Sequence, residues 1–567
     1  MAITGSPAVI VKEQDLSSFV SADSVTTGAV VGNFEWGPVE SIKKITSEGN
    51  LVQYFGKPYD WNYADWFTAK NYLQYSNSLA VVRAFDAETF LNATDSGVGV
   101  LIENDSKFEE RLIEITDAVK VVARYPGAMG NKLRVCILNK LGLEEQLKAI
   151  KNADATKVIE NGVYIYKNPN GTELFVNKAL NYIPLRSLDK NEVVVVVLRV
   201  NEDGTEDVLE HGIYSTIDGS TDTTGYNNYV FKHFNNNSNW IYLIEKNLSF
   251  YNENGEMLEV NEGEFLLGGG VGGEKFTNHS PYMFGWDLFK NEETEEAQVQ
   301  LLMQGGANRE IGEYIIQIAE SRKDCLACVS PEMKEVVHKK SADAVASMID
   351  PNGTGSYYSH SSYAFMDGNY KYQYDNYNDV YRWMPLNGDV AGIMAQIDSD
   401  EEPWMSPGGK VIKNCVKLAF HPTKAERDDL FAYNINPVTN FRAEGNILYG
   451  DWTRVSNTSF NFIGVRRLFL YIERAIKEYA RTIMWKQNDE ITETMFIQTV
   501  EPFLYDVQGG RGIQEFRVLA GSSVTSPDEM DRGIFRAKIL IKPVRSIRYV
   551  ELVFTSVRSD MNIEEIV

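Results

Sequence analysis

Residues 78–85 have the sequence SLAVVRAF, a nearly continuous apolar run. Strands of a parallel sheet are covered on both faces, so continuous runs are typical of them, whereas half-exposed strands alternate. A second run, SVTTGAVVG at residues 24–32, also predicts a strand, and the segment from Asp65 to Tyr75 between the two predicts a helix. Strand, helix and strand in succession indicate an α/β unit, and therefore a parallel sheet in the core.

The same alternation returns after a long interruption. Within residues 280–420, the stretch 298–322 contains a predicted helix, and CLACVSP after it predicts a strand. We therefore predict a discontinuous α/β core made of residues 21–85 and 265–420. We predict an α+β fold with several domains, of which this core is one.

The interruption, residues 86–264, has a different composition. It is rich in Asn, Asp, Gly and Glu, and it holds short β-like runs such as GVYIYK at 162–167 and EVVVVVLRV at 192–200. Turn sequences such as NPNG and NEDG lie between the runs. This pattern predicts one or two β-rich insertions at the surface. After them, LLGGGVGG at 266–273 lacks the GK[ST] ending of a phosphate-binding loop, so we interpret it as a flexible connector.

The C-terminal part, residues 421–545, is predicted to form a separate α+β domain. Thr423, with Glu426 three residues later, has the spacing of a capping box and predicts a helix over residues 423–435. Residues 463–486 hold the strongest helical pattern of the chain.

Short apolar segments lie near both ends of the chain. AVIVKE occupies residues 8–13, whereas FRAKILIKP at 535–543 and IRYVELVFTS at 547–556 predict two strands. A strand at a terminus is either paired within its own sheet or donated to another chain. We predict an N-terminal arm over residues 1–20 and a C-terminal strand or arm over residues 546–567.

The composition argues against several classes of function. The 567-residue chain has a formal net charge of -24, a field that repels phosphate and argues against direct nucleic-acid binding over a broad surface. No run reaches the ~18 apolar residues of a membrane-spanning helix, and the N-terminus lacks the pattern of a signal peptide. Because G-x-S-x-G, H-E-x-x-H and Walker sequences are also missing, we predict no enzyme activity and no catalytic, cofactor-binding or metal-binding residues.

Two of the four cysteines, Cys325 and Cys328, form a CxxC sequence. A zinc site would need a second pair or histidines at ligand spacing, and no histidine lies near this pair in the sequence. Residues three apart on a strand point to opposite faces. We therefore predict buried free thiols.

One segment opposes the acidic character of the chain. Residues 466–486, RRLFLYIERAIKEYARTIMWK, hold six basic residues and two acidic ones. At about 100° per residue, the basic and the apolar side chains fall on opposite faces of a helix. The apolar face is predicted to pack on the protein's own core, and the basic face is either solvated or bound to a nucleic acid or an acidic protein. The basic side chains concerned are Arg467, Arg474, Lys477 and Arg481, and the apolar ones are Leu468, Ile472, Ala475, Tyr479 and Ile483.

Five short motifs follow one another along the chain: SPAVIVKE at 6–13, ARYPGAMGN at 123–131, PLNGDVAGI at 385–393 with Asp398, Trp404 and SPGG at 406–409, Ile435-Asn436, and RRL with YIE at 466–473. Together they resemble the contractile tail sheath proteins of myophages. The corresponding patterns there are S-P-G-V-Y-x-x-E, A-x-x-P-G-x-x-G-N, P-P-S-G-x-V-A-G with a later D and W-x-x-P-A-G, I-N, and V-R-R-L-x-x-Y-I-E. This chain departs from them at Leu386 and Asn387, which replace Pro and Ser.

The resemblance implies a structural subunit that polymerises helically around a tail tube and contracts to drive the tube through the host envelope. Its implied partners are further copies of itself, the tail tube protein, and the baseplate and tail terminator proteins, with no direct nucleic acid and no membrane. The implied location is the virion, after assembly in the host cytoplasm. A sheath subunit of a bacterial contractile injection system, pyocin-like or related, is the alternative that the residues do not separate.

The resemblance also suggests which residues touch these partners. The C-terminal domain of the family faces the tube and touches it with its long helix, so the tube-binding hypothesis falls on Arg467, Arg474, Lys477 and Arg481. The terminal arms of the family add strands to neighbouring subunits. The residues that this assigns to inter-subunit strands are Val9, Ile10, Val11, Val550, Leu552 and Phe554.

Overall fold

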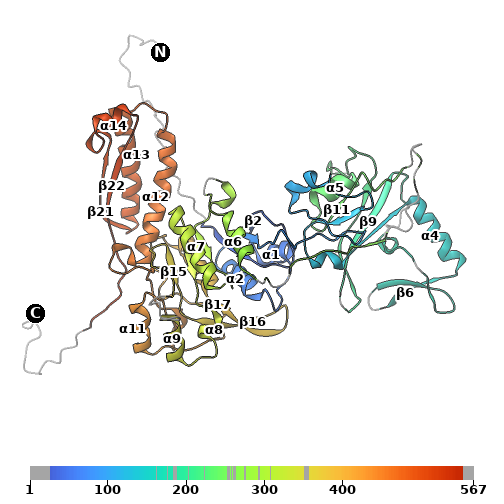
Figure 1. Ribbon diagram of the computed structural model, residues 1–567, viewed down its shortest axis with the longest axis horizontal. Coiled ribbons are helices and arrows are strands. Elements are labelled where there is room, and N and C mark those ends of the chain that lie inside the picture. The colour runs from blue at the N-terminus through green and yellow to red at the C-terminus, as the bar shows by residue number, and fades with distance from the viewer. Residues whose placement is uncertain are drawn as a thin grey trace, which may run out of the picture.

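The computed structural model describes residues 26–552, apart from 161–162, 175, 183–187, 202, 223, 252–255, 257, 259–263, 274–275, 277, 292–293, 307 and 350–356. The predictions for Val9, Ile10, Val11 and Phe554 lie outside the described residues. Figure 1 shows an elongated molecule in three parts: a central α/β body, a β-rich insertion at one end, and a C-terminal unit of long helices and a hairpin that rises beside the body.

The body is built on one six-stranded sheet with the order β15-β14-β13-β1-β3-β2. All neighbouring pairs are parallel except β2 with β3, which is antiparallel at the edge. Gly28 at the start of β1 pairs with Leu79 on one side and Leu301 on the other, so strands from both sides of the insertion meet at the centre. The predicted parallel pairing of the runs at 24–32 and 78–85 is thereby confirmed. The strands are β1 (Gly28–Gly32), β2 (Lys43–Ile45), β3 (Leu79–Arg83), β13 (Leu301–Met303), β14 (Leu326–Val329) and β15 (Ala364–Met366).

Helices cover both faces of this sheet. Ala29 and Val31 face a core that includes Trp286 of α6 and Ile315 of α7, whereas Val30 faces the opposite core under α2 and α10. Because both faces are buried, β1, β13, β14 and β15 hold no polar side chain, and β3 holds only Arg83, as continuous apolar runs predict. Smaller elements complete the body. The helices are α1 (Glu48–Phe55), α2 (Tyr63–Leu73), α6 (Ser280–Asp287), α7 (Arg309–Arg322), α8 (Met333–Val336), α9 (Ser341–Ile349) and α10 (Asn387–Asp400), and the remaining strands are β16 (Tyr370–Asp375), β17 (Val380–Pro385) and β18 (Lys417–Leu418).

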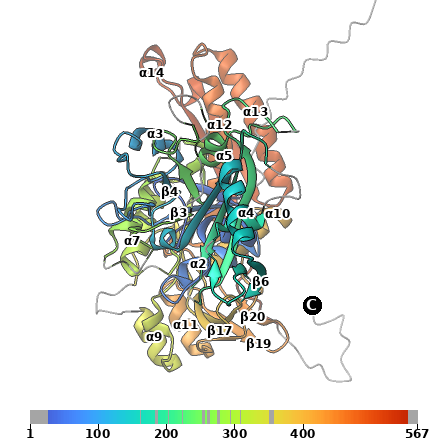
Figure 2. The same ribbon diagram turned by 90° about the vertical axis from the view of Figure 1, so that its right-hand side faces the viewer.

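The insertion has a core of its own, made largely of antiparallel strands. Its main sheet has the order β10-β9-β5-β12, and the sheets β11-β4 and β6-β7-β8 lie beside it. Strands appear at β7 and β9 where GVYIYK and EVVVVVLRV predict them. Figure 2 views the molecule from this end, with α4 in front of the body. The elements are α3 (Phe108–Arg111), α4 (Lys140–Asn152), α5 (Val230–Asn237), β4 (Val121–Ala123), β5 (Leu133–Asn139), β6 (Thr156–Glu160), β7 (Val163–Lys167), β8 (Glu173–Leu174), β9 (Glu192–Val200), β10 (Glu206–Ser215), β11 (Ile241–Leu243) and β12 (Glu264–Leu266).

The glycine-rich segment at 266–273 is part of the insertion, and the prediction of a flexible connector is wrong. Thr94 forms a β-bridge with Gly268, and Leu91 forms one with Val271. Gly269 has φ +79, and a side chain there would lie 2.5 Å from the carbonyl oxygen of Gly97. The glycines therefore permit close pairing of the backbone. The absence of a GK[ST] ending excludes a phosphate loop but does not predict this pairing.

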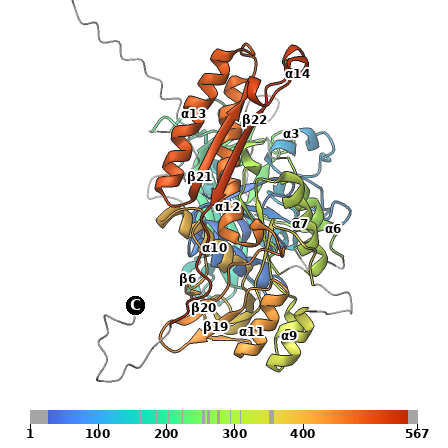
Figure 3. The ribbon, with the colours of Figure 1, turned by 90° about the vertical axis from the view of Figure 1, so that its left-hand side faces the viewer.

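The C-terminal region begins on the body and continues into a separate unit. Helix α11 (Lys424–Ala432) starts with the predicted capping box of Thr423 and Glu426. Residues of this helix and of the hairpin β19 (Val438–Phe441) and β20 (Gly445–Leu448) contribute to the two cores of the body. The C-terminal unit, residues 463–543, holds α12 and α13 packed on the β21–β22 hairpin (Figure 3). Its elements are α12 (Ile463–Ile483), α13 (Glu490–Gly509), α14 (Pro527–Asp531), β21 (Ile513–Ala520) and β22 (Ala537–Pro543).

Two predictions for the C-terminal region differ from the structure. The long helix ends at Ile483 rather than residue 486, because Met484 leaves the helical region and Trp485 has a φ of 73°. The expected strand over 547–556 does not form in its described part, residues 547–552. A strand needs a partner, and β22 already ends at Pro543.

The cysteine prediction is confirmed for the CxxC pair. Cys325 and Cys328 are both fully buried, as free thiols, at β14 of the central sheet. Burial raises the pKa of both thiols above their usual value, that of Cys328 to about 12. None of the helices among the described residues combines the length and the apolar character that crossing a membrane requires.

Candidate interface on helix α12

Helix α12 joins the body to the C-terminal unit. The apolar side chains Leu468, Ile472 and Tyr479 are buried against α13 and the β21–β22 hairpin, which confirms the predicted apolar face. A second stripe begins with Ile463 and Leu470, which are buried in the core of the body. Positions three and four apart share one face of a helix, so the basic residues of α12 lie on the same face as Ile463 and Leu470. The predicted basic face therefore turns toward the body.

Arg467 does not belong to an exposed basic surface, and its assignment as a tube-binding residue is wrong. Only 5% of Arg467 is exposed, and its guanidinium forms an ion pair with Asp398 of α10. It also donates to the carbonyl oxygen of Met394 at 3.0 Å. A buried guanidinium requires such partners, since an unpaired buried charge is costly. Helical periodicity predicts which side chains share a face of α12. It does not predict that the turn around Arg467 packs against the body.

Arg466 is buried as well, although it lies one position away on the helix. It is 5% exposed and lies over the rings of Phe460 and Tyr363, at 3.8 and 4.3 Å from their centroids. Burial lowers the pKa of this guanidinium, and the charges of Tyr363 and Glu473 oppose that change. Arg466 and Arg467 thus anchor α12 to the body.

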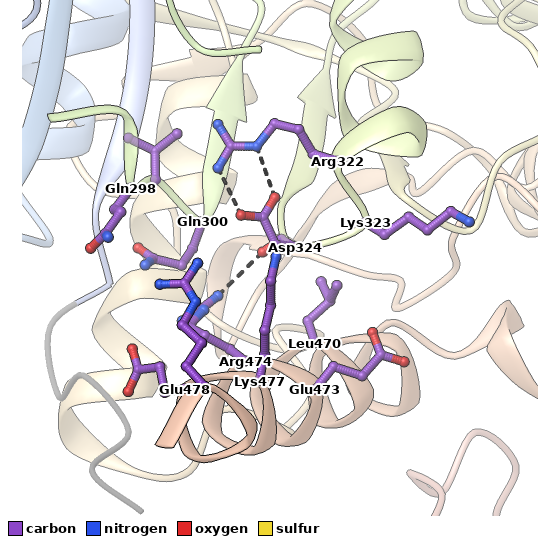
Figure 4. A pocket seen from close by; sticks show the side chains of 12 residues that line it. Gln298, Gln300, Arg322, Lys323, Asp324, Leu470, Glu473, Arg474, Lys477 and Glu478 are labelled. Carbon is purple, nitrogen blue, oxygen red and sulfur yellow. Dashed lines mark hydrogen bonds and ion pairs between the residues drawn. The ribbon is translucent and has the colours of Figure 1, made fainter. Parts of the chain in front are cut away.

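The other three basic residues line a groove between α12 and the body (Figure 4). Arg474 is half-buried in this groove, whereas Lys477 and Arg481 are exposed along it. The cavity volume is about 220 Å³. The opposite wall consists of the segment before β13 and the turn after α7. The residues that line this opposite wall are Gln298, Val299, Gln300, Arg322, Lys323 and Asp324. The residues of α12 that line the groove are Leu470, Glu473, Arg474, Lys477, Glu478 and Arg481.

One acidic side chain of the groove, that of Asp324, already forms hydrogen bonds within the protein. Arg322 donates two hydrogen bonds of 2.8 Å to the two carboxylate oxygens of Asp324. Arg474 donates to the carbonyl oxygen of Asp324 at 3.3 Å. Burial opposes ionisation of Asp324, but the hydrogen bonds from Arg322 and the charges of Arg322 and Arg474 hold its pKa below the usual value. Asp324 lies 150 residues before Arg474 in the sequence, and no local pattern marks it or the neighbouring Arg322 and Lys323 as groove residues.

Beyond the groove, the end of α12 presents apolar side chains to solvent. Trp485 is 99% exposed and Met484 is 59% exposed, immediately after the helix. Ile491, in the first turn of α13, is 70% exposed. Tryptophan and methionine are enriched in protein interfaces, so their exposure at the end of α12, directly before Lys486, is typical of a contact surface.

The C-terminal segment after β22 is held at one point and exposed beyond it. The guanidinium of Arg548 lies between the rings of Trp452 and Phe462, 3.4 Å from each centroid. Its Nε donates to Asp451 Oδ1 at 2.7 Å. Of the predicted arm residues, Val550 is 75% and Leu552 is 71% exposed.

The sheet of the C-terminal unit has open edges. Among the described residues, β21 and β22 pair only with each other, in an antiparallel hairpin. A two-stranded hairpin leaves the outer N–H and C=O groups of both strands unpaired, and these groups can accept strands from other chains. Within the part of the chain that the structure describes, no three His, Cys, Asp or Glu side chains are grouped so as to hold a metal ion.

Two consecutive parts of the chain match known protein families. Residues 282–454 match the phage tail sheath protein central domain, and residues 455–555 match the phage tail sheath C-terminal domain. The second match begins just before α12, at the junction of body and C-terminal unit. The two matches are consecutive and run from α6 to the C-terminal segment.

Two relatives that align with nearly the whole chain are also named tail sheath proteins. The tail sheath protein of Vibrio phage KVP40 is 29% identical over 687 aligned positions, which cover 99% of each chain. That of Enterobacteria phage T4 is 28% identical over 666 positions, again with 99% of each chain covered.

Solved structures show the fold at lower identity. A sheath tail protein of Listeria innocua aligns over 93% of both chains with a TM-score of 0.54 and 12% identity. One of Desulfitobacterium hafniense aligns over 95% of this chain and 100% of its own with a TM-score of 0.50 and 12% identity. The fold, the domain matches and the relatives all point to the tail sheath class of phage proteins. The chain is similar to phage tail sheath proteins: two consecutive domains of that family match residues 282–555, and two phage tail sheath proteins align with it over 99% of its length.

Proposed function

We propose that this chain is the repeating subunit of a contractile phage tail sheath. It polymerises helically around the tail tube, and its contraction drives the tube through the host envelope to deliver the genome. The observation that carries this proposal is the pair of consecutive tail sheath domain matches, together with relatives that align over 99% of the chain. Both reported full-length relatives come from phages, which favours a phage tail over a bacterial contractile injection system.

Subunit linkage is assigned to the terminal arms. An open helical array requires contacts between different patches on neighbouring subunits. The open edges of the β21–β22 hairpin are suited to receive strands, and the exposed Val550 and Leu552 lead out of the C-terminal unit. We assign Val9, Ile10 and Val11 and the segment through Phe554 to strands added to neighbouring sheets. Main-chain pairing keeps the lattice connected while subunits rotate.

The tube contact is assigned to the outer end of α12. Lys477 and Arg481 are exposed there, and Trp485 and Met484 extend the surface. The partner that fits is an acidic protein surface with apolar pockets, which we propose to be the tail tube protein. Exposed ion pairs contribute only ~0–1 kcal/mol each, so many of them hold a sheath in place yet separate during contraction.

Contraction needs no nucleotide in this scheme. The energy comes from the difference between a metastable extended lattice and a contracted one, as in other strain-release switches. The glycine-rich segment at 266–273 is used for backbone pairing in the insertion and lacks the GK[ST] ending of a nucleotide loop. Baseplate and tail terminator proteins are the proposed partners at the two ends of the sheath, in a virion that assembles in the host cytoplasm.

Electron microscopy of the purified full-length protein tests this function. We expect helical tubes of polymerised sheath, and with purified tail tubes present we expect the tubes to be coated. A protein that stays monomeric or forms closed rings under all assembly conditions would contradict the proposal.

A further inference from the structure

The described chain begins at the foot of the α12 groove. The hydroxyl of Thr26 donates to Asp398, the carboxylate that also pairs with Arg467 of α12. The backbone N–H of Thr27 donates to the side chain of Gln300 at 2.6 Å, and Gln300 lines the groove. The chain that precedes Thr26 therefore starts beside α12, at the level of Arg467.

The reach of the preceding residues matches the spacing of cations on α12. Arg474 lies two turns beyond Arg467, which corresponds to about 10 Å along the helix axis. Three residues of extended chain also span about 10 Å. Asp23, three positions before Thr26, can thus reach Arg474.

The charges of the two surfaces are complementary. Residues 13–25, EQDLSSFVSADSV, contain three acidic residues and no basic one. The groove is lined by five cationic side chains and three acidic ones, of which Asp324 is already held by two hydrogen bonds from Arg322. Between its acids the segment has Phe19 and Val20, and the groove offers Val299 and Leu470 between its charges.

We propose that the groove between α12 and the turn after α7 binds an acidic extended peptide, and that this peptide is residues 13–25 of the same chain, with Asp23 paired to Arg474. The contact fixes the direction in which residues 1–12 leave the body. The proposal thus assigns the part of the N-terminal arm that lies nearest the body to a binding site within the same chain. The inference is tested at Arg474, whereas the tube contact is assigned to Lys477 and Arg481 at the outer end of the same groove and to Trp485 beyond it.

Hydrogen exchange of the full-length monomer, below its assembly concentration, tests this site. Amides of residues 13–25 are expected to be protected in the wild type, and Arg474→Glu should raise their exchange rates by about tenfold or more. The charge swap Asp23→Arg with Arg474→Glu should restore protection. Arg517→Glu, the same charge change at an exposed position of β21, serves as the matched control and should have no effect. Equal exchange in the wild type and Arg474→Glu would overturn the proposal.

Disulfide trapping identifies the occupant without charge reversal. In the double variant Asp23→Cys and Arg474→Cys, mild oxidation is expected to give a cross-link within one chain, seen as a compact monomer on a non-reducing gel. A cross-link that forms only between two chains would assign the groove to a second copy and overturn the intramolecular proposal. No cross-link in either form would do the same.

Discussion

Lys371 Nζ lies 2.8 Å from Asp389 Oδ1, and neither side chain has any exposed surface. The hydroxyl of Tyr75 donates to the same oxygen at 3.1 Å, and Lys371 also donates to the carbonyl oxygen of Lys413 at 3.1 Å. Burial raises the pKa of Asp389, and the Lys371 cation and its hydrogen bond oppose that rise. Asp389 belongs to the PLNGDVAGI motif, so this motif forms part of the ion pair that joins α10 to β16.

Removing one partner of this pair should destabilise the body. Asp389→Ala leaves the ammonium of Lys371 buried without a counterion, so we expect the free energy of unfolding to fall by about 3–5 kcal/mol. Urea denaturation followed by tryptophan fluorescence measures the change. The double variant Lys371→Met with Asp389→Leu replaces both charges by apolar groups and should lose much less. A loss below about 1 kcal/mol for Asp389→Ala would contradict the assigned role.

A second buried carboxyl should make stability depend on pH. Asp367, at the end of β15, is 1% exposed. Burial raises its pKa from 3.8 to about 8, against hydrogen bonds from Ser330 and the backbone of Asn369. Between these two values the folded protein keeps a proton that the unfolded chain has lost. Stability should therefore fall as the pH rises from 3.8 toward about 8.

Asp367→Asn keeps the shape of the side chain and removes its titration. We expect this variant to lose less stability than the wild type between pH 5 and pH 8, by at least about 1 kcal/mol, in urea denaturation at each pH. Asp117→Asn, at an exposed position, is the control and should follow the wild type. Parallel pH profiles for Asp367→Asn and the wild type would show that Asp367 ionises normally.

The Arg548 clamp should control assembly more than folding. Its guanidinium is held by Trp452, Phe462 and Asp451, contacts that fix where the C-terminal segment leaves the body. Cation–π contacts contribute ~0.5–2 kcal/mol, and Asp451 keeps the hydrogen bond from Ser406 when the guanidinium is removed, so Arg548→Ala should lower the melting temperature only modestly. Because the segment loses its fixed exit, we expect few or no sheath tubes by electron microscopy.

Lys542→Ala, an exposed position on β22, is the matched control for the clamp and should assemble normally. Normal tube formation by Arg548→Ala would show that the clamp does not direct the arm.

The tube surface is tested by charge reversal at the end of α12. The double variant Lys477→Glu and Arg481→Glu should reduce coating of tail tubes by about tenfold or more at low salt, because several weak pairs reverse sign in every subunit. Assembly of the sheath without tail tubes should be retained, because Arg474, the proposed partner of Asp23, is intact in this variant. Lys44→Glu, an exposed position on β2, is the control and should coat tubes normally. Unaffected coating by the double variant would place the tube contact elsewhere.

The N-terminal arm is tested by deletion. A variant without residues 1–13 should fold as a monomer and fail to polymerise, because it can no longer donate a strand to its neighbour. Sedimentation and electron microscopy measure this outcome. Wild-type tubes after the deletion would contradict strand donation by Val9, Ile10 and Val11.

The sequence by itself determined the elements whose pattern is local. The nearly continuous apolar run at 78–85 and the strand pattern at 24–32 predicted two central strands, and the Thr423–Glu426 spacing predicted the start of α11. The apolar face of α12 followed from its periodicity in the same way. Each of these depends on residues within a few turns or one strand, where spacing alone sets the burial pattern.

Tertiary structure alone decided what surrounds those elements. Arg467 looks like the rest of the basic face in the sequence, yet its turn of α12 packs on the body and meets Asp398, 69 residues away. The groove likewise needs residues 298–300 and 322–324 opposite α12. Residues 547–552 have the composition of a strand but form none, since a strand requires a partner. Burial and pairing depend on contacts between distant segments, and local spacing does not encode them.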